Sequence, residues 1–326
     1  MQHPREVLQG PQASVAQIPV CDHYSGAPQR MQKSLQLQAD MTAQTGVCLF
    51  DVTLDCEDGA AVGQEAEHAA LVARLVLAAP QAARVAARVH PVGYPAFTSD
   101  VETIVGQAGH RLTHLMIPKV ESVDDVLAAE RALNAAGAKT LPLHVLIESP
   151  SAVQQAFDIA AHPRVQSLSF GLMDFVSAHG GAIPASAMGA QGQFEHPLVV
   201  RAKLEIASAC HAHGKVPSHC VVTEFSDLAA LHRAASQAAD RFGFTRMWSI
   251  HPAQIRPILQ AFAPAADAIE MAAKILFAAI QADWAPINFD GVLHDRASYR
   301  YYWQLLERAQ RTGSPLPALA QPWFAA

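Results

Sequence analysis

The sequence predicts an α/β protein built on a (β/α)8 TIM barrel, with a C-terminal helical lid extension. Eight short apolar runs alternate with alanine-rich helical segments, which is the pattern of βα units around a parallel sheet. The runs are nearly continuous in apolar residues, as expected of parallel strands that are buried on both faces. Polar or charged residues end most of the runs, beginning with Asp22 and His23 in the first, and burying them inside an open sheet would cost several kcal/mol each. At the carboxyl ends of barrel strands the same residues form an active site, which favours the barrel.

The predicted strands and helices follow one another along most of the chain. We expect strands at 18–23, 48–55, 84–90, 113–119, 143–148, 166–171, 216–222 and 246–250. Helical patterns lie between them at 64–77, 123–136, 150–161, 197–213 and 225–242. Gly137, Gly214 and Gly243 follow three of these helices, as glycine often does at a helix C-terminus.

Two regions lie outside this repeat. Residues 175–194 are rich in glycine and are expected to form a mobile loop over the barrel mouth, with a plain linker as the alternative. Two further helices are expected at 265–282 and 298–312, joined by residues 288–295. The first is apolar over more of its surface than a lone surface helix needs, so we expect a neighbouring subunit to cover part of it. We therefore expect a catalytic barrel domain at 18–255 and a helical extension at 256–326.

Composition limits the possible partners. The 326 residues are 51% hydrophobic and 16% charged, with a formal net charge of −6. A large core is possible, and no basic field exists to hold nucleic acid or an anionic membrane surface, so a small-molecule substrate is expected. The five cysteines form no CxxC motif, which disfavours a disulfide framework. No apolar run approaches the roughly 20 residues of a membrane helix, and no secretory signal is visible, so we expect a cytoplasmic protein.

Glu148 and Asp174 are the strongest candidate metal ligands. They follow the fifth and sixth predicted strands, and neighbouring strands lie about 4.8 Å apart. Two carboxylates so close repel each other unless a proton or cation lies between them. Mg²⁺ binds such a pair and keeps positions open for water and substrate oxygens. Capping of a following helix is the structural alternative for either acid.

Arg88 and Glu57 are candidate catalytic residues at the ends of the third and second predicted strands. An arginine there can bind a carboxylate or a developing oxyanion with its fork of donors. The alternative is a structural ion pair with Glu57 or Asp58, and both roles can hold together. Glu57 could orient a metal-bound water, whereas helix capping explains Asp58 equally well.

Other chemistries have weaker support. Lys119 is expected in an ion pair with Glu121 or Glu148, because a Schiff-base role needs a desolvated lysine. Cysteines and histidines at 210–220 lack the spacing of a zinc site, although His219 remains a candidate for lining the site. The sequence contains no GxGxxG after a strand, no GxxxxGK[ST], no HExxH and no GxSxG, so nicotinamide-cofactor, P-loop, zincin and serine-hydrolase functions lack support.

The chain resembles a known family, the citrate lyase β-subunit-like (malyl-CoA/citramalyl-CoA lyase-like) branch of the HpcH/HpaI aldolase superfamily. The resemblance spans roughly residues 18 to 310 and rests on motifs that occur in the same order. They are Asp-Cys-Glu-Asp at 55–58, Arg-Val-His-Pro at 88–91, Pro-Lys-Val-Glu at 118–121, Ile-Glu-Ser-Pro at 147–150, Phe-Gly-Leu-Met-Asp at 170–174, Ile-His-Pro-Ala-Gln-Ile at 250–255 and Asp-Gly-Val-Leu-His-Asp at 290–295.

The resemblance implies roles for individual residues. Mg²⁺ would sit on Glu148 and Asp174, Arg88 would contact the substrate, and Glu57 would support it. Asp295 would reach the site of a neighbouring subunit. Gly26 and Arg30 match part of the family's CoA-binding segment.

The resemblance also implies an activity and an assembly. Family members cleave or form carbon–carbon bonds in carboxylated 3-hydroxyacyl-CoA substrates such as malyl-CoA or citramalyl-CoA, and most are trimers or multiples of trimers. We therefore expect a Mg²⁺-dependent lyase that acts on an acyl-CoA and a 2-oxo acid, assembled as a trimer or hexamer.

Departures from the family pattern leave two alternatives open. The first predicted strand leads into Ser-Gly-Ala-Pro-Gln-Arg-Met at 25–31, with one arginine fewer than the family pattern. The arginine expected after the Ile-Glu-Ser-Pro motif is also replaced, by Ser-Ala-Val at 151–153. One alternative is a CoA-free 2-oxo acid aldolase of the HpcH type. The other is a non-catalytic protein that binds acyl-CoA or organic acids.

Overall fold

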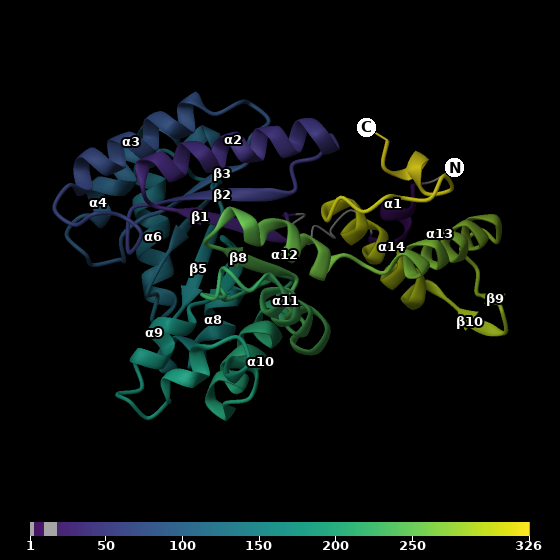
Figure 1. Ribbon diagram of the computed structural model, residues 1–326. Helices are drawn as coiled ribbons and strands as arrows, with labels where there is room; N and C mark the ends of the chain where they lie inside the picture. Colours follow the sequence, from purple (N-terminus) through teal and green to yellow (C-terminus); the bar gives the residue numbers. More distant parts are fainter. Residues whose placement is uncertain (1–2, 10–17, 326) are drawn as a thin grey trace. The chain divides into compact units, whose positions relative to one another are not determined.

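Eight parallel strands form a closed barrel in the computed structural model, which describes residues 3–9 and 18–325 (Figure 1). Each strand pairs with the next in the sequence, and the eighth pairs with the first. The predicted barrel is confirmed, and every predicted strand overlaps an observed one. The strands are β1 (Cys21–Ser25), β2 (Phe50–Asp55), β3 (Val85–Arg88), β4 (Leu112–Ile117), β5 (Leu143–Ile147), β6 (Val165–Phe170), β7 (Val216–His219) and β8 (Arg246–Ser249).

Helices connect consecutive strands and surround the barrel. The predicted helices correspond to α3 (Glu65–Ala78), α6 (Val123–Ala135), the pair α7 (Pro150–Gln154) and α8 (Ala156–Ala161), α10 (Pro197–Ala212) and α11 (Leu228–Phe242). We did not predict α2 (Pro28–Thr45), α4 (Phe97–Asp100), a π-helix (Val101–Val105), α5 (Gly106–Ala108), a 3-10 helix (Gly109–Arg111) or, after β8, a 3-10 helix (Pro252–Gln254) and α12 (Ile255–Phe262).

The segment between β6 and α10 folds into short helical turns. They are α9 (Leu172–Ser177) and two 3-10 helices (Ala185–Met188 and Gly192–Phe194). Ile183, Ala187 and Gln193 are buried, so part of this segment packs against the barrel unit. Its motion over the mouth stays a prediction.

Buried ion pairs lie in the core of the barrel unit. Arg246 contacts Asp22 at 2.9 Å and Asp51 at 2.7 Å, and Arg84 contacts Asp51 at 2.6 Å. Opposite charges placed this close offset part of the cost of removing each from water. We expected Asp22 and His23 at the barrel mouth, and this is wrong. Asp22 lies in the ion-pair layer, and His23 is buried with its Nδ1 atom 2.9 Å from the Ser249 hydroxyl.

The chain divides into two compact units, Pro19–Ala261, which contains the barrel, and a second unit of residues before 19 and after 261. Within the described residues the second unit contains α1 (Pro4–Gln9), α13 (Ala266–Gln281), α14 (Arg296–Arg311) and a 3-10 helix (Gln321–Trp323). The two predicted C-terminal helices correspond to α13 and α14. The predicted use of this unit as a lid stays a prediction.

Residues 288–295, expected only as a connection, form most of a hairpin. β9 (Ile287–Phe289) pairs antiparallel with β10 (Val292–His294). Asp290 and Gly291 lie between the strands with φ of 49° and 82°, the positive values that a tight two-residue hairpin turn requires. Each strand has three residues, too few for an alternating pattern to be recognised in the sequence.

Most of the apolar surface of α13 is buried within its own unit. Ile269, Ile275 and Leu276 pack in a cluster that also contains Tyr299 and Trp303 of α14. We expected a second subunit to cover the apolar side chains of α13. For Ile269, Ile275 and Leu276 this expectation is wrong. Met271 and Phe277 of α13 are exposed. Among the described residues no helix has the length and apolar character needed to cross a membrane.

Candidate active site

A cluster of charged side chains lies at the carboxyl ends of five consecutive strands. Arg88 is the last residue of β3, Glu57 and Lys119 follow β2 and β4, and Glu148 and Asp174 follow β5 and β6. The closed parallel barrel brings these strand ends together at one mouth. The structure therefore gathers four predicted site residues, Glu57, Arg88, Glu148 and Asp174, in one place.

Arg88 is held by two carboxylates and one aromatic ring. Its Nε and Nη2 atoms donate to the two oxygens of Asp55 at 2.6 and 3.0 Å, and Nη1 contacts Glu57 Oε2 at 2.8 Å. The guanidinium lies 4.5 Å from the ring centre of Tyr24, which packs on Trp248. The expected ion pair with Glu57 is present, but the fork of the arginine faces Asp55.

We did not predict Asp55 as the main partner of Arg88. The signal that could have found it is the strand register, because Asp55 and Arg88 stand opposite each other on β2 and β3. Asp55 is fully buried and also accepts hydrogen bonds from the backbone N–H groups of Glu57 and Gly59 at 3.0 and 2.6 Å.

Glu148 is a buried carboxylate with an unusual affinity for protons. Burial, together with the nearby charge of Asp174, raises the pKa of Glu148 to about 7, and the Arg88 charge and the Lys119 backbone N–H oppose this shift. Gly171 makes room for it, because a Cβ atom at position 171 would overlap the Glu148 side chain. Asp174 is half-buried in the first turn of α9.

The donor set around Glu148 fits a magnesium ion. Five carboxylates (Asp55, Glu57, Asp58, Glu148 and Asp174) face two cations (Arg88 and Lys119), a formal excess of three negative charges. Hard divalent cations prefer such oxygen ligands. The charge of Asp174 makes ionisation of Glu148 more costly, and among the described residues no arginine or lysine side chain forms a salt bridge with either acid.

Lys119 is bound differently from what we expected. We predicted an ion pair with Glu121 or Glu148, but the Nζ atom instead contacts Glu57 and, at 3.5 Å, Asp58. The backbone N–H of Lys119, rather than its side chain, donates to Glu148 Oε2 at 2.9 Å. Glu121 accepts a hydrogen bond from Ser149 at 2.6 Å.

The predicted cofactor residues occupy different environments. Gly26 is buried, and a Cβ atom there would overlap the Gly59 backbone. Gly26 therefore has a packing reason to be glycine, independent of any ligand. Arg30 is exposed in the first turn of α2 and forms no ion pair with any described residue.

Asp295 lies in the second unit as the N-cap of α14. Its Oδ1 atom accepts hydrogen bonds from the backbone N–H groups of Ala297 and Ser298 at 2.9 and 3.3 Å. The side chain is exposed. Helix capping alone would explain an aspartate here, so a catalytic role for Asp295 stays a prediction.

Burial excludes His219 from an accessible site. His219 is fully buried against Phe194 and Phe244. Among the described residues one trio, Asp22, His114 and His144, brings three metal-type ligand atoms within 4.8 Å of one another. It differs from the predicted pair, its two imidazoles do not suit Mg²⁺, and Arg246 already balances the charge of Asp22.

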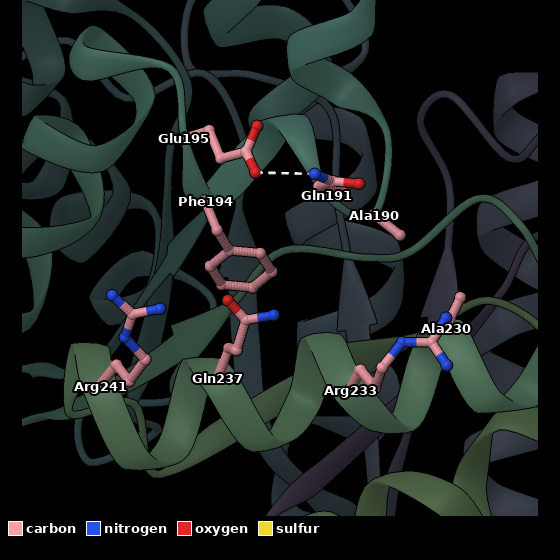
Figure 2. A pocket seen from close by; sticks show the side chains of 8 residues that line it. All are labelled: Ala190, Gln191, Phe194, Glu195, Ala230, Arg233, Gln237 and Arg241. Carbon is pink, nitrogen blue, oxygen red and sulfur yellow. Dashed lines mark hydrogen bonds between the residues drawn. The ribbon is translucent and has the colours of Figure 1, made fainter.

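A hollow of about 440 Å³ opens between residues 190–195 and α11. Figure 2 shows Arg233, Gln237 and Arg241 along α11 below the ring of Phe194. Across the hollow, Gln191 donates to Glu195 at 2.8 Å. None of the predicted site residues lines this hollow.

Comparison with known proteins supplies a family. The family model described as HpcH/HpaI aldolase/citrate lyase matches residues 34–252. An L-malyl-CoA/beta-methylmalyl-CoA lyase from Cereibacter sphaeroides is 29% identical over 246 residues, 70% of this chain and 76% of that protein. A malyl-CoA/beta-methylmalyl-CoA/citramalyl-CoA lyase from Chloroflexus aurantiacus is 26% identical over 72% of this chain and 73% of its own.

Solved structures share the fold. A citrate lyase from Burkholderia xenovorans LB400 is 47% identical, with a TM-score of 0.82 over 99% of this chain and 100% of that one. The protein CitE from Mycobacterium tuberculosis, solved with magnesium, acetoacetate and coenzyme A, is 22% identical, with a TM-score of 0.68 over 91% of this chain and 99% of that one.

Proposed function

The chain belongs to the HpcH/HpaI aldolase/citrate lyase family, and from this membership we propose that it is a Mg²⁺-dependent carbon–carbon lyase. The substrate class would be a carboxylated 3-hydroxyacyl-CoA such as malyl-CoA or citramalyl-CoA, as in the names of its relatives. The observation that carries the proposal is the pair Glu148 and Asp174, whose mutual repulsion calls for a cation at the barrel mouth beside Arg88.

Four residues of the mouth have a task in this reaction. Glu148 and Asp174 would hold Mg²⁺, which when bound polarises the oxygens of a 2-oxo acid. The N–H bonds of Arg88 that Asp55 and Glu57 leave free would stabilise the oxyanion that forms as the carbon–carbon bond breaks. Glu57 would keep Arg88 in place.

The proton balance assigns a task to Asp295. In the cleavage direction the 3-hydroxyl group loses a proton, the bond between C2 and C3 breaks, and C2, the carbon next to the thioester carbonyl, gains a proton. We propose that Asp295 of another copy of the chain exchanges the proton at that carbon. Assembly as a trimer or hexamer would supply this second copy.

Two residues, Arg30 and Gly26, support the proposed binding of CoA. Arg30 is the exposed cation of the segment that matches the family's CoA-binding motif, and it is free of ion pairs among the described residues. Gly26 would let the backbone come close to the ligand, in addition to its packing against Gly59.

A substrate panel tests the proposal. Lyase activity would be measured with malyl-CoA, citramalyl-CoA and free 2-hydroxy acids, with Mg²⁺ and with excess chelator. We expect activity only with a CoA thioester and Mg²⁺, and its loss in Asp174→Asn but not in the exposed control Asp240→Asn. Activity on free hydroxy acids alone would indicate a CoA-free aldolase, and ligand binding without turnover would indicate a binding protein.

A mixing experiment tests the role of Asp295. Asp295→Ala and Arg88→Ala proteins would each be inactive, but after subunit exchange some sites would receive both intact residues. We expect partial recovery of activity in the mixture. No recovery despite proven exchange, or a monomer in solution, would refute this part of the proposal.

A further inference from the structure

We propose that Lys119 positions both acidic centres of the active site, Glu148 through its backbone N–H and Glu57 through its ammonium group. This inference rests on the proposed function, in which Lys119 has no task of its own. It adds to the residues that bind metal and substrate a residue, Lys119, that fixes the distance between Glu148 and Glu57.

The backbone of Lys119 adopts a conformation that lysine rarely takes. Its φ is 51°, in the left-handed region where side chains with a Cβ atom meet steric strain. Such strain persists when surrounding interactions compensate for it, and it is concentrated at functional sites. Here the turn directs the Lys119 N–H to Glu148 Oε2 at 2.9 Å. A hydrogen bond to a buried carboxylate is among the stronger ones in proteins.

The side chain of Lys119 crosses from the end of β4 to the loop after β2. Its ammonium group contacts Glu57 Oε1 while Arg88 contacts Glu57 Oε2. Both oxygens of a carboxylate that is only 6% exposed are therefore bound by cations, one from each side. Without Lys119 one of them would lose its partner in a nearly buried position.

The same contacts leave Lys119 as the more accessible cation of the mouth. Its side chain is 38% exposed, whereas that of Arg88 is 5% exposed and committed to Asp55 and Glu57. Removing the ammonium would raise the formal excess of negative charge from three to four. Mg²⁺ binding should then be unchanged or tighter, even though Glu57 and Arg88 are less well placed.

Lower activity combined with undiminished Mg²⁺ affinity distinguishes a positioning role of Lys119 from a general disruption of the site. In Lys119→Met we expect kcat to fall about 10- to 100-fold, as for a lost charge-assisted hydrogen bond, with KM changed by less than about 3-fold. Mg²⁺ affinity, measured by calorimetry without substrate, should be unchanged or higher. Lys119→Arg should recover part of kcat, since arginine can reach Glu57. Lys139→Met, at an exposed lysine, is the matched control.

Two more variants isolate the backbone contact. Lys119→Gly removes the ammonium but accepts positive φ, so its Mg²⁺ affinity should match that of Lys119→Met. Lys119→Pro removes the N–H and fixes φ near −65°, so its Mg²⁺ affinity should fall at least about 10-fold. Circular dichroism checks folding, and the methionine and glycine variants keep the test decisive if the proline variant unfolds.

Three results would overturn the inference. They are full kcat in Lys119→Met, weaker Mg²⁺ binding in Lys119→Met and Lys119→Gly, or equal Mg²⁺ binding in folded Lys119→Pro and Lys119→Gly. Wild-type protein without lyase activity on any CoA thioester would instead refute the proposed function, while the Mg²⁺ titrations would still report on Lys119.

Discussion

Asp55 and Arg88 are register partners on β2 and β3, and both oxygens of the Asp55 carboxylate bind the guanidinium of Arg88. Asp55 is fully buried, and its orientation is fixed by the backbone N–H groups of Glu57 and Gly59. The protein itself therefore sets the direction of Arg88 before any substrate binds. Such preorganisation makes an arginine effective against a developing negative charge.

The first prediction concerns this buried pair. Asp55→Asn should lower the free energy of unfolding by about 3–5 kcal/mol, because it leaves the Arg88 charge without its main partner. The double variant with Arg88→Met should lose less than the sum of the two single changes. Urea unfolding of all four proteins measures this coupling. The control is Glu205→Gln, which breaks an exposed pair with Arg201 and should change stability by less than about 1 kcal/mol. Additive losses in the Asp55 and Arg88 variants would contradict an interaction between these two residues.

The second prediction concerns Gly171. Gly171→Ala should weaken Mg²⁺ binding at least about 10-fold, because the new methyl group would occupy the space of the Glu148 side chain and overpacking displaces neighbours. Calorimetric titration with Mg²⁺ measures the effect. Gly106→Ala is the matched control, since a Cβ atom there meets open space. Equal Mg²⁺ affinity in the two variants would show that Glu148 is not a ligand or that it moves freely.

The third prediction concerns CoA and Arg30. Binding of free CoA should weaken as salt rises, since an exposed arginine attracts phosphate through a field that ions screen. Arg30→Ala should reduce both the affinity and its salt dependence, whereas Arg131→Ala, at an exposed arginine on α6, should change neither. Fluorescence or calorimetric titrations at two salt concentrations decide this. A salt-independent affinity equal in all three proteins would remove Arg30 from the site.

The fourth prediction concerns the buried His144. Burial lowers its pKa from 6.5 to about 3, and the charge of Arg246 acts in the same direction. The unfolded chain therefore binds a proton near pH 6.5 that the folded chain does not bind until about pH 3. Stability from this group is complete above pH 7 and is lost as pH falls, by about 2 kcal/mol between pH 7 and pH 5.

Variants separate this contribution from the rest of the acid response. His144→Gln should flatten the decline in unfolding free energy between pH 7 and pH 5, whereas His232→Gln, at an exposed position, should leave it unchanged. Chemical denaturation at several pH values provides the measurement. An undiminished slope in His144→Gln would mean that His144 binds its proton equally in both states.

Much of the fold followed from local patterns. Apolar runs of five to eight residues, with helical periodicity between them, predicted the eight strands and the helices that connect most of them. Such patterns depend on neighbours close in the sequence, and they fail for short elements such as β9 and β10. The position of a polar residue at the end of a run is also a local feature, so such residues could be assigned to the mouth as a group. Asp22 was misplaced because a single strand does not reveal that Arg246 lies beside it.

The sequence by itself determined the (β/α)8 class and the set Glu57, Arg88, Glu148 and Asp174 as strand-end residues of one mouth. Only the tertiary structure decided which charges pair. Arg88 joins Asp55 through strand register, and Lys119 joins Glu57 across 62 residues of sequence. Coulomb energies depend on distances of a few ångströms, and these distances are fixed only when the barrel closes.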